Sequence, residues 1–241
     1  MLRVAERFYS IQGEGRYAGT PAYFVRLSGC NFMCNWEKAN GENEVCDTLK
    51  VWQQTKEEIA PFDLAAKIID ELRTVQASRA VHIVLTGGEP LLQKKEAADL
   101  IRKLKFEGFF CELETNGSIP DFDFYALFDN VNWSPKMRSA GYGKEYYEKK
   151  GMLSFWKENA GKLSLDMKVV IGNNYDLEEL DEWLVALNGS IAASRVFLMP
   201  VCNTRKEHEE GVQILVEACM RRGLKLSPRL QLVIWNKTVG V

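Results

Sequence analysis

The 241-residue sequence contains only two histidines, no long apolar run and no excess of charge of one sign. Its formal net charge of −2 excludes the broad basic surface of a general nucleic-acid binder. No apolar run approaches the about 20 residues that a membrane-spanning helix needs. Residues 1–7 lack the apolar stretch and cleavage site of a signal peptide. We therefore expect neither a nucleic acid nor a membrane as a partner.

Six cysteines in a chain of this length do not indicate a secreted disulfide scaffold, so a cytoplasmic location is expected. The sequence also lacks internal repeats and low-complexity segments. Its hydrophobic content of 46% is sufficient for one sizeable core. We therefore expect a single domain over residues 1–241.

Three of the six cysteines are close together in a polar loop. Three residues separate Cys30 from Cys34, and eleven separate Cys34 from Cys46. Thiolates bind zinc and iron–sulfur clusters. A structural zinc needs four ligands, and no fourth cysteine or histidine is near this loop. A [4Fe–4S] cluster held by three cysteines would leave one iron open, although the spacing alone is equally compatible with three unrelated cysteines.

Strand-like and helical segments alternate from residue 23 to the C-terminus. Strands are expected at residues 23–27, 81–85, 109–114, 131–133, 165–171 and 196–199, and helices at 62–76, 94–105, 121–128, 177–187 and 207–221. This alternation predicts an α/β fold with a parallel sheet, either open or curled. About six βα units are fewer than the eight of a closed barrel. Residues 141–162 form a polar insertion that carries aromatic side chains.

Two segments near the N-terminus carry candidate ligand-binding residues. The glycines of residues 11–15 would let the backbone approach a ligand. Gln12 has an amide that donates and accepts, and Glu14 is an acceptor. A polar turn before a strand is the alternative that this block alone slightly favours. Arg26 interrupts an apolar strand, which suits an anionic substrate or an exposed strand face.

Polar residues follow the ends of several expected strands, where active sites occur in parallel α/β folds. These rim segments are residues 86–90, 114–117, 134–136 and 199–200. Gly87 and Gly88 offer backbone donors, and Glu89 could bind an ammonium group. Each segment alone could be an ordinary turn between a strand and a helix. Four of them on one rim beside the cysteine loop predict a site.

Several sequence blocks occur in the order typical of one known family. They are residues 11–15 (IQGEG), 24–31 (FVRLSGCN), 46–48 (CDT), 86–90 (TGGEP), 114–117 (ETNG), 134–136 (SPK) and 227–231 (SPRLQ). On these blocks the chain resembles the 7-carboxy-7-deazaguanine synthases, which are radical S-adenosylmethionine (SAM) enzymes of the 7-deazapurine (queuosine) pathway. The resemblance implies a partial (β/α)6 TIM-like barrel of the radical SAM type and a homodimer.

The resemblance also implies the reaction and its cofactors. A 5′-deoxyadenosyl radical from SAM would abstract hydrogen at C6 of 6-carboxy-5,6,7,8-tetrahydropterin. Ring contraction with loss of ammonia would then give 7-carboxy-7-deazaguanine. The implied cofactors are a [4Fe–4S] cluster, SAM and Mg²⁺, and the implied partners are the small-molecule pterin and a flavodoxin- or ferredoxin-like electron donor.

Matching positions imply three groups of site residues. The cluster ligands would be Cys30, Cys34 and Cys46, with Thr48 on Mg²⁺. The pterin site would comprise Ile11, Gln12, Gly13, Glu14, Arg26 and Thr86, with Arg26 on the substrate carboxylate. The SAM site would comprise Val45, Cys46, Asp47, Gly88, Glu89, Ser134, Pro135 and Lys136, with Glu89 on the amine.

The cysteine spacing departs from the family pattern, C-x3-C-x2-C. The cluster loop, residues 30–48, contains an insertion at about 35–45, and Val45 takes the usual aromatic position. The insertion carries Glu37, Lys38, Glu42 and Glu44, so its outer part is expected to be solvated. His208 is expected to be exposed and Cys202 to be a core thiol. Two other functions remain open: a radical SAM activase that acts on a partner protein, and a non-catalytic zinc or interaction module.

Overall fold

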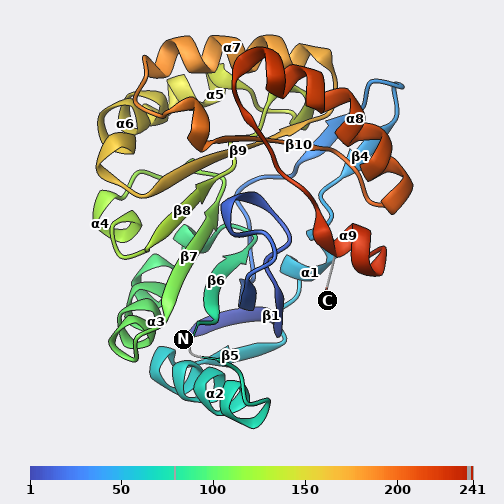
Figure 1. Ribbon diagram of the computed structural model, residues 1–241. Coiled ribbons are helices and arrows are strands. Elements are labelled where there is room, and N and C mark those ends of the chain that lie inside the picture. Colours follow the sequence, from blue (N-terminus) through green and yellow to red (C-terminus); the bar gives the residue numbers. More distant parts are fainter. Residues whose placement is uncertain (79, 238–239, 241) are drawn as a thin grey trace.

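The computed structural model describes residues 1–78, 80–237 and 240. It contains a curled nine-stranded sheet, ordered β11-β10-β9-β8-β7-β6-β2-β1-β5, with helices around its outside (Figure 1). The strands of this sheet are β1 (Leu2–Ile11), β2 (Pro21–Leu27), β5 (Glu57–Ile59), β6 (His82–Gly87), β7 (Phe110–Thr115), β8 (Asn130–Trp133), β9 (Leu165–Ile171), β10 (Val196–Pro200) and β11 (Lys225–Leu226). The helices are α1 (Leu49–Trp52), α2 (Pro61–Thr74), α3 (Lys94–Phe106), α4 (Phe122–Tyr125), α5 (Lys144–Lys149), α6 (Met152–Asn159), α7 (Asn174–Leu187), α8 (Arg205–Arg222) and α9 (Leu230–Trp235).

The six expected strands belong to the parallel part of the sheet, which β11 extends beyond β10. β2, β6, β7, β8, β9 and β10 are neighbours in chain order, each parallel to the next. β1 and β5 extend one edge in antiparallel pairing, so the sheet is a partial barrel rather than a closed one. The predicted α/β fold is confirmed. Because parallel strands share a direction, the segments that follow them meet at one rim.

The core lies between the sheet and the surrounding helices. Helix α2 begins with Pro61 at its first turn, and its Leu64, Ile68 and Leu72 form one buried face. Each fully buried aliphatic side chain of this kind contributes about 1.5–3 kcal/mol. The strands β2 and β6 each contain a buried apolar run, residues 22–25 and 83–85, as expected for parallel strands that are covered on both faces.

Residues 141–162 contain α5 and α6, and their aromatic side chains support the rim. Tyr147 and Trp156 are completely buried. The Tyr147 hydroxyl donates to the carbonyl oxygen of Asn116 at 2.8 Å, and the Trp156 indole N–H donates to that of Gly117 at 3.0 Å. These two bonds fix the segment that follows β7. The insertion therefore contributes to the rim geometry.

The enlarged part of the cluster loop is an antiparallel hairpin of β3 (Asn35–Glu37) and β4 (Asn43–Val45). Glu37 and Glu42 are exposed, as expected for a charged insertion. Lys38 is not, since only 13% of its side chain is exposed and it forms ion pairs with Glu44 at 2.6 Å and Glu207 at 3.0 Å. The outer part of the hairpin is thus exposed, whereas Lys38 and Glu44 are partly buried because the hairpin packs against the barrel rim.

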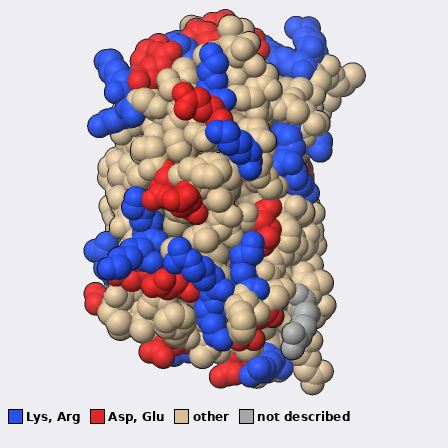
Figure 2. Space-filling view, turned by 90° about the vertical axis from the view of Figure 1, so that its left-hand side faces the viewer, with Lys and Arg blue, Asp and Glu red and all other residues tan. Residues whose placement is uncertain are grey.

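Figure 2 shows acidic and basic side chains intermixed over the face that carries α3, α4 and α6. This pattern agrees with the near-neutral net charge of the sequence. Among the described residues, no helix has the length and apolar character needed to cross a bilayer.

Candidate active site

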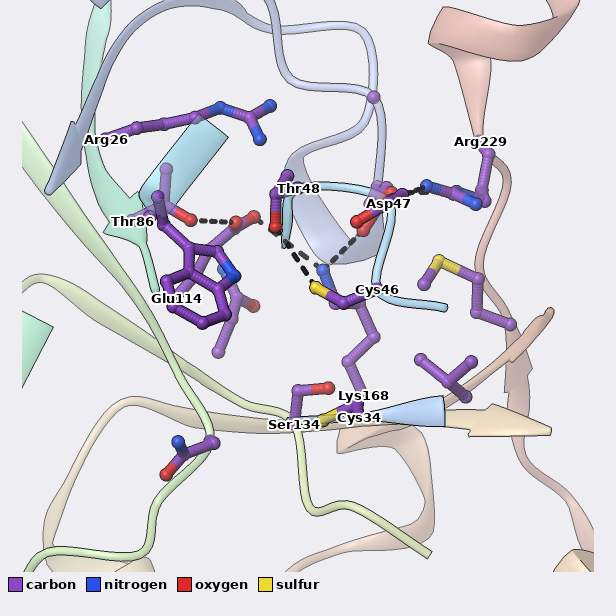
Figure 3. Close-up of a pocket in the computed structure, with 18 of the residues that line it drawn as sticks. Arg26, Cys34, Cys46, Asp47, Thr48, Thr86, Glu114, Ser134, Lys168 and Arg229 are labelled. Atoms are coloured by element: carbon purple, nitrogen blue, oxygen red, sulfur yellow. Dashed lines mark hydrogen bonds and ion pairs between the residues drawn. The ribbon is translucent and has the colours of Figure 1, made fainter. Parts of the chain in front are cut away.

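One large cavity opens at the carboxyl ends of the parallel strands. It contains about 1390 Å³ of empty space, including space open to solvent. The cavity lining includes every residue predicted for the site except Glu89 and Pro135. The close-up in Figure 3 shows how side chains from several separate strands and loops surround it.

The glycine pair after β6 allows the rim to approach the cysteine loop. A Cβ atom on Gly88 would lie 1.9 Å from the carbonyl oxygen of Gly29. The Gly88 N–H donates to Leu27 O at 3.1 Å, and the Glu89 N–H donates to Gly29 O at 2.9 Å. These donors therefore hold the start of the loop and are not free for a ligand. Gly88 is required here because the two backbones are in contact.

The three cysteines of the cluster loop line the same cavity. The Cys46 N–H donates to Cys34 O at 3.1 Å, so the hairpin brings together two cysteines that are eleven residues apart. The pKa of Cys34 is raised to about 12, chiefly by burial; Lys136 opposes this effect, and the nearby Cys46 and Cys30 thiols add to it. The thiols thus share one electrostatic environment.

The donor set fits a cluster better than a single ion. Among the described residues, no group of three or more His, Cys, Asp or Glu side chains converges closely enough to hold one metal ion. In a [4Fe–4S] cluster each thiolate binds a different iron, so the sulfur atoms need not converge on one point. Three thiols around a cavity wall therefore suit a cluster with an open iron, and a closed four-ligand zinc site does not fit.

A polar group forms the part of the cavity nearest β6 and β7. The Thr86 hydroxyl donates to Glu114 Oε2 at 2.8 Å, and the Gln12 amide lies 3.5 Å from Glu114 Oε1. All three side chains line the cavity. The structure therefore brings together Gln12 and Thr86, which were predicted, and adds Glu114.

Arg26 lines the cavity with an incompletely paired guanidinium. Its Nε lies 3.1 Å from Glu6 Oε1, but both atoms are buried without a hydrogen-bond partner of acceptable geometry among the described residues. Phe8 lies under the guanidinium, 5.5 Å from it. An arginine in this state retains donors for an anion that enters the cavity.

Glu14 is part of a buried ionic network. Lys168 Nζ donates to Glu14 Oε2 at 2.6 Å, while Arg229 Nε and Gln231 Nε2 donate to Oε1 at 3.1 and 2.7 Å. Arg229 also pairs with Asp47 at 2.5 Å (Figure 3). Burial alone would raise the pKa of Glu14, but attraction to Lys168 and Arg229 and the hydrogen bonds outweigh it and lower that pKa. Glu14 is therefore an ionised anchor whose oxygens are already engaged.

Glu89, predicted to bind the amine of SAM, lies behind the cavity wall. Its side chain is completely buried and does not line the cavity. Its carboxylate accepts from Asn116 N at 2.8 Å, from Leu91 N at 3.1 Å and from Thr115 Oγ1 at 2.9 Å. In this structure Glu89 holds the rim segments after β6 and β7 together. Pro135 also lies outside the lining.

Glu89 is expected to make stability depend on pH. Burial raises the pKa of Glu89 from 4.5 to about 6, against the hydrogen bonds to its carboxylate. The folded protein then binds the proton of Glu89 more tightly than the unfolded chain does, which adds to the free energy of unfolding. This contribution is complete below pH about 4.5 and is lost as the pH rises through about 6. Glu89→Gln has no carboxyl group to ionise and escapes this loss. The free energy of unfolding of the cluster-free variant, minus that of cluster-free wild type, should therefore rise by about 2 kcal/mol between pH about 4 and 7. Urea unfolding measures it, and a difference that does not change with pH would contradict it.

Several residues of the cavity were assigned no individual role from the sequence. They include Glu114 and Asn116, which lie in the predicted rim segment 114–117, and Lys168, Arg229 and Gln231. The sequence offered a sign that Lys168 belongs to the site, because it is a charged residue within a strand that is otherwise buried. His208 was predicted to be exposed, but it is buried and its Nε2 accepts from the Arg229 N–H at 3.1 Å. That prediction is wrong because the C-terminal segment covers this face of α8. Cys202 is buried, as expected for a core thiol, and also lines the cavity.

Comparisons with known proteins identify the family of this chain. The model of the Radical SAM superfamily matches residues 25–136. The 7-carboxy-7-deazaguanine synthases of Pyrobaculum aerophilum and Halobacterium salinarum are each 32% identical to the chain, covering 99% and 98% of it and 97% and 91% of their own lengths. The crystal structure of QueE from Escherichia coli aligns with a TM-score of 0.62 and 25% identity, covering 94% of this chain and 92% of that one. Identity at this level over nearly the whole chain shows that it belongs to the 7-carboxy-7-deazaguanine synthase family of radical SAM enzymes.

Proposed function

We propose that this chain converts 6-carboxy-5,6,7,8-tetrahydropterin to 7-carboxy-7-deazaguanine with loss of ammonia. The observation that carries the proposal is a single cavity lined by three cysteine thiols and also by Gln12, Arg26, Thr86 and Glu114. Thiols suit a cluster, and the polar group suits a heterocycle that bears a carboxylate. Both sites must share one cavity for a radical to reach its substrate.

Cys30, Cys34 and Cys46 would hold the [4Fe–4S] cluster. When bound, the cluster and SAM supply a 5′-deoxyadenosyl radical that abstracts hydrogen at C6 of the pterin. Phe32 and Tyr142, whose stacked ring centroids are 3.9 Å apart, would limit water around the thiols. Met33, in the same loop, is 61% exposed, so this side of the loop is accessible to the flavodoxin- or ferredoxin-like electron donor that we also propose.

The pterin would bind to the polar group near β6 and β7. A pterin edge presents both donors and acceptors, which Gln12, Thr86 and Glu114 complement. Ile11 and Gly13 would contact it through their backbone. Glu14 would contribute by fixing this loop, since its oxygens accept from Lys168, Arg229 and Gln231. Orientation of C6 toward the thiol side would then depend on the chain's own polar groups.

SAM would bind between the cluster loop and the rim segment after β8. Val45, Asp47, Gly88, Ser134 and Lys136 line this part of the cavity, and Lys136 Nζ donates to Ser134 Oγ at 3.0 Å. Glu89 could reach the amine only if the Thr115 and Asn116 contacts rearranged. We therefore assign Glu89 and Pro135 to the support of this site.

We further propose that Thr48 helps hold Mg²⁺ beside the substrate carboxylate. The Thr48 hydroxyl lines the cavity 3.4 Å from Cys46 Sγ. Mg²⁺ prefers oxygen ligands and keeps several of its water ligands. The Thr48 hydroxyl and the substrate carboxylate would therefore be enough to complete its coordination. The ion would stabilise charge during ring contraction. We also propose that the enzyme is a cytoplasmic homodimer.

The reaction itself tests the proposed function. Reconstituted protein is incubated without oxygen with the tetrahydropterin, SAM and a reductant, with and without Mg²⁺, and the deazapurine is followed by mass. We expect product without any partner protein, about four irons per chain, and faster turnover with Mg²⁺. Zinc without iron, or turnover only with a protein substrate, would overturn the proposal in favour of an interaction module or an activase.

Replacement of Arg26 should weaken binding of the substrate carboxylate. Hydrogen bonds to a charged group are worth about 1.5–3 kcal/mol, so Arg26→Gln is expected to raise KM for the pterin by about 10- to 100-fold. Binding of SAM should be unchanged. Steady-state kinetics at saturating SAM measure the effect. The matched control is Arg102→Gln, whose arginine is exposed on α3 and pairs only with Asp99 among the described residues. An equal change in both variants would contradict the assignment of Arg26.

A further inference from the structure

A β-bulge in β1 places Glu6 beside Arg26. The register of β1 on β2 shifts between Val4 and Glu6, so Ala5 is an extra residue and Glu6 lies opposite Arg26. Residues directly opposite each other on antiparallel strands have their side chains on the same face. Without the extra residue, the side chain of Glu6 would be on the other face of the sheet. The bulge therefore turns this carboxylate toward the barrel interior, next to the arginine of the cavity.

Glu6 and Phe8 hold the guanidinium of Arg26 from two sides. Glu6 Oε1 lies 3.1 Å from Arg26 Nε, and Glu6 itself does not line the cavity. The ring of Phe8 lies 5.5 Å from the guanidinium and stacks on Phe24, with 5.1 Å between the ring centroids. Figure 3 shows the Arg26 side chain extending from β2 into the cavity. Among the described residues this side chain has no other ion-pair or hydrogen-bond partner, so its two terminal nitrogens remain for a ligand.

The charge of Glu6 determines how much negative charge this side of the cavity accepts. Lys168, the nearby cation, already pairs with Glu14 at 2.6 Å and lies 3.7 Å from Glu114. Arg26 is likewise accompanied by a carboxylate, so no excess of positive charge is available here for an anion. A ligand carboxylate can accept two charge-assisted hydrogen bonds from the terminal nitrogens of Arg26. It is repelled by Glu6 as one charge, whereas a phosphate dianion is repelled as two, because Coulomb energy is proportional to charge.

We propose that Glu6 is a positioning residue that sets the specificity of Arg26, so that the site selects a pterin with one carboxylate over a pterin with a phosphate group. Glu6 acts through Arg26 and does not touch the substrate. It lowers the affinity for every anion, but the reduction is larger for a dianion. The inference rests on the proposed function, because it assumes that Arg26 binds the substrate carboxylate.

Three oxidised pterins that differ in the charge of the group at C6 test this inference. They are pterin itself, 6-carboxypterin with one negative charge, and the phosphate ester of 6-hydroxymethylpterin. At pH about 7.5 the phosphate carries about two negative charges, since its second pKa is about 6. Oxidised pterins have no hydrogen at C6 to abstract, so binding is measured without turnover. Equilibrium dialysis against reconstituted protein with SAM and without reductant gives Kd for each ligand.

Wild type should bind 6-carboxypterin at least about tenfold more tightly than the phosphate ester. Glu6→Gln keeps an oxygen beside Arg26 Nε and removes the charge. Its Kd for pterin should stay within about twofold of wild type, and its Kd for 6-carboxypterin should fall by about three- to tenfold. Its Kd for the phosphate ester should fall by the square of that factor, about 10- to 100-fold. Glu6→Asp retains the charge and should retain the wild-type preference for the carboxylate.

The matched control is Glu57→Gln, which removes a carboxylate that pairs with Arg7 at 3.4 Å outside the cavity and should leave all three Kd values unchanged. A merely structural role of Glu6 would change the three Kd values of Glu6→Gln by one common factor, and that result, or no change, overturns the inference. If Glu6→Gln does not fold, wild type decides, because equal affinity for the carboxylate and the phosphate ester also overturns it.

The two proposals fail in different ways. If the Kd values change with ligand charge as expected but no deazapurine forms in the turnover assay, the proposed function fails and this inference stands. If deazapurine forms and Glu6→Gln changes the three Kd values equally, the proposed function stands and this inference fails.

Discussion

Substitution of Cys46 by alanine is expected to abolish both the iron–sulfur cluster and conversion of the pterin. Cys30, Cys34 and Cys46 line one cavity, and their number leaves no spare ligand for the cluster. Removal of one thiolate leaves an iron without its protein ligand. We expect iron to fall from about four per chain to a small fraction of that after anaerobic reconstitution. Iron analysis, the visible absorption of the cluster and deazapurine formation measure the result.

The control for this prediction is the other thiol of the cavity. Cys202 also lines it but lies after β10, and its Sγ is near Arg229 rather than the cluster loop. Cys202→Ala should retain about four irons per chain, as should Cys111→Ala in the core. A cluster that survives Cys46→Ala but not Cys202→Ala would mean that the ligand set is wrong and that Cys202 is the third ligand.

Substitution of Arg229 by methionine is expected to lower the free energy of unfolding by about 3–5 kcal/mol. Only 6% of the Arg229 side chain is exposed, and it pairs with Glu14 at 3.1 Å and Asp47 at 2.5 Å. It also donates to the carbonyl oxygen of Cys202. Removal of one partner of a buried ion pair leaves the remaining charge desolvated and uncompensated. Urea unfolding of the cluster-free protein at pH about 7 measures the loss.

Two further variants identify the cause of that loss. Arg222→Met breaks an ion pair with Asp181 in which half of the Asp181 side chain is exposed, and should cost at most about 1 kcal/mol. Adding Glu14→Gln to Arg229→Met removes one of the two carboxylates that lose Arg229 as a partner, Glu14 still being paired with Lys168, and should recover part of the stability. If the loss of unfolding free energy in the double variant equalled the sum of the losses in the two single variants, the ionic network would not be the source of the effect.

Arg229 also explains why the C-terminal segment belongs to the site. Its guanidinium joins the loop after β1 through Glu14 and the cluster loop through Asp47. The sequence block 227–231 resembled the family pattern, but no role could be assigned to it because its partners are about 180–215 residues away in the chain. Only folding brings such distant residues into contact, so the pattern of neighbouring residues in the sequence does not predict their pairing.

The strands of the barrel were predictable because their signal is local. Residues 165–171 form an apolar run that only Asp166 and Lys168 interrupt, which predicts a strand. The observed strand β9 has the same bounds. β1 and β5 were missed. β1 mixes charged and apolar residues, with Glu6 and Arg7 at its centre, so its strand character depends on pairing with β2. Edge pairing is a tertiary property, and propensity does not determine it.

The sequence by itself determined the alternation of strands and helices, the cysteine triplet and the polar blocks at the strand ends. These are properties of neighbouring residues, and the direction shared by parallel strands gathers them on one rim. Only the tertiary structure decided that Glu89 is a buried support, that the Arg26 Nε is buried beside Glu6 without a well-aligned hydrogen bond, and that Trp36 reaches the cavity with an unsatisfied N–H. Burial and hydrogen-bond satisfaction depend on which distant residues pack nearby, and that information is absent from any local stretch of the chain.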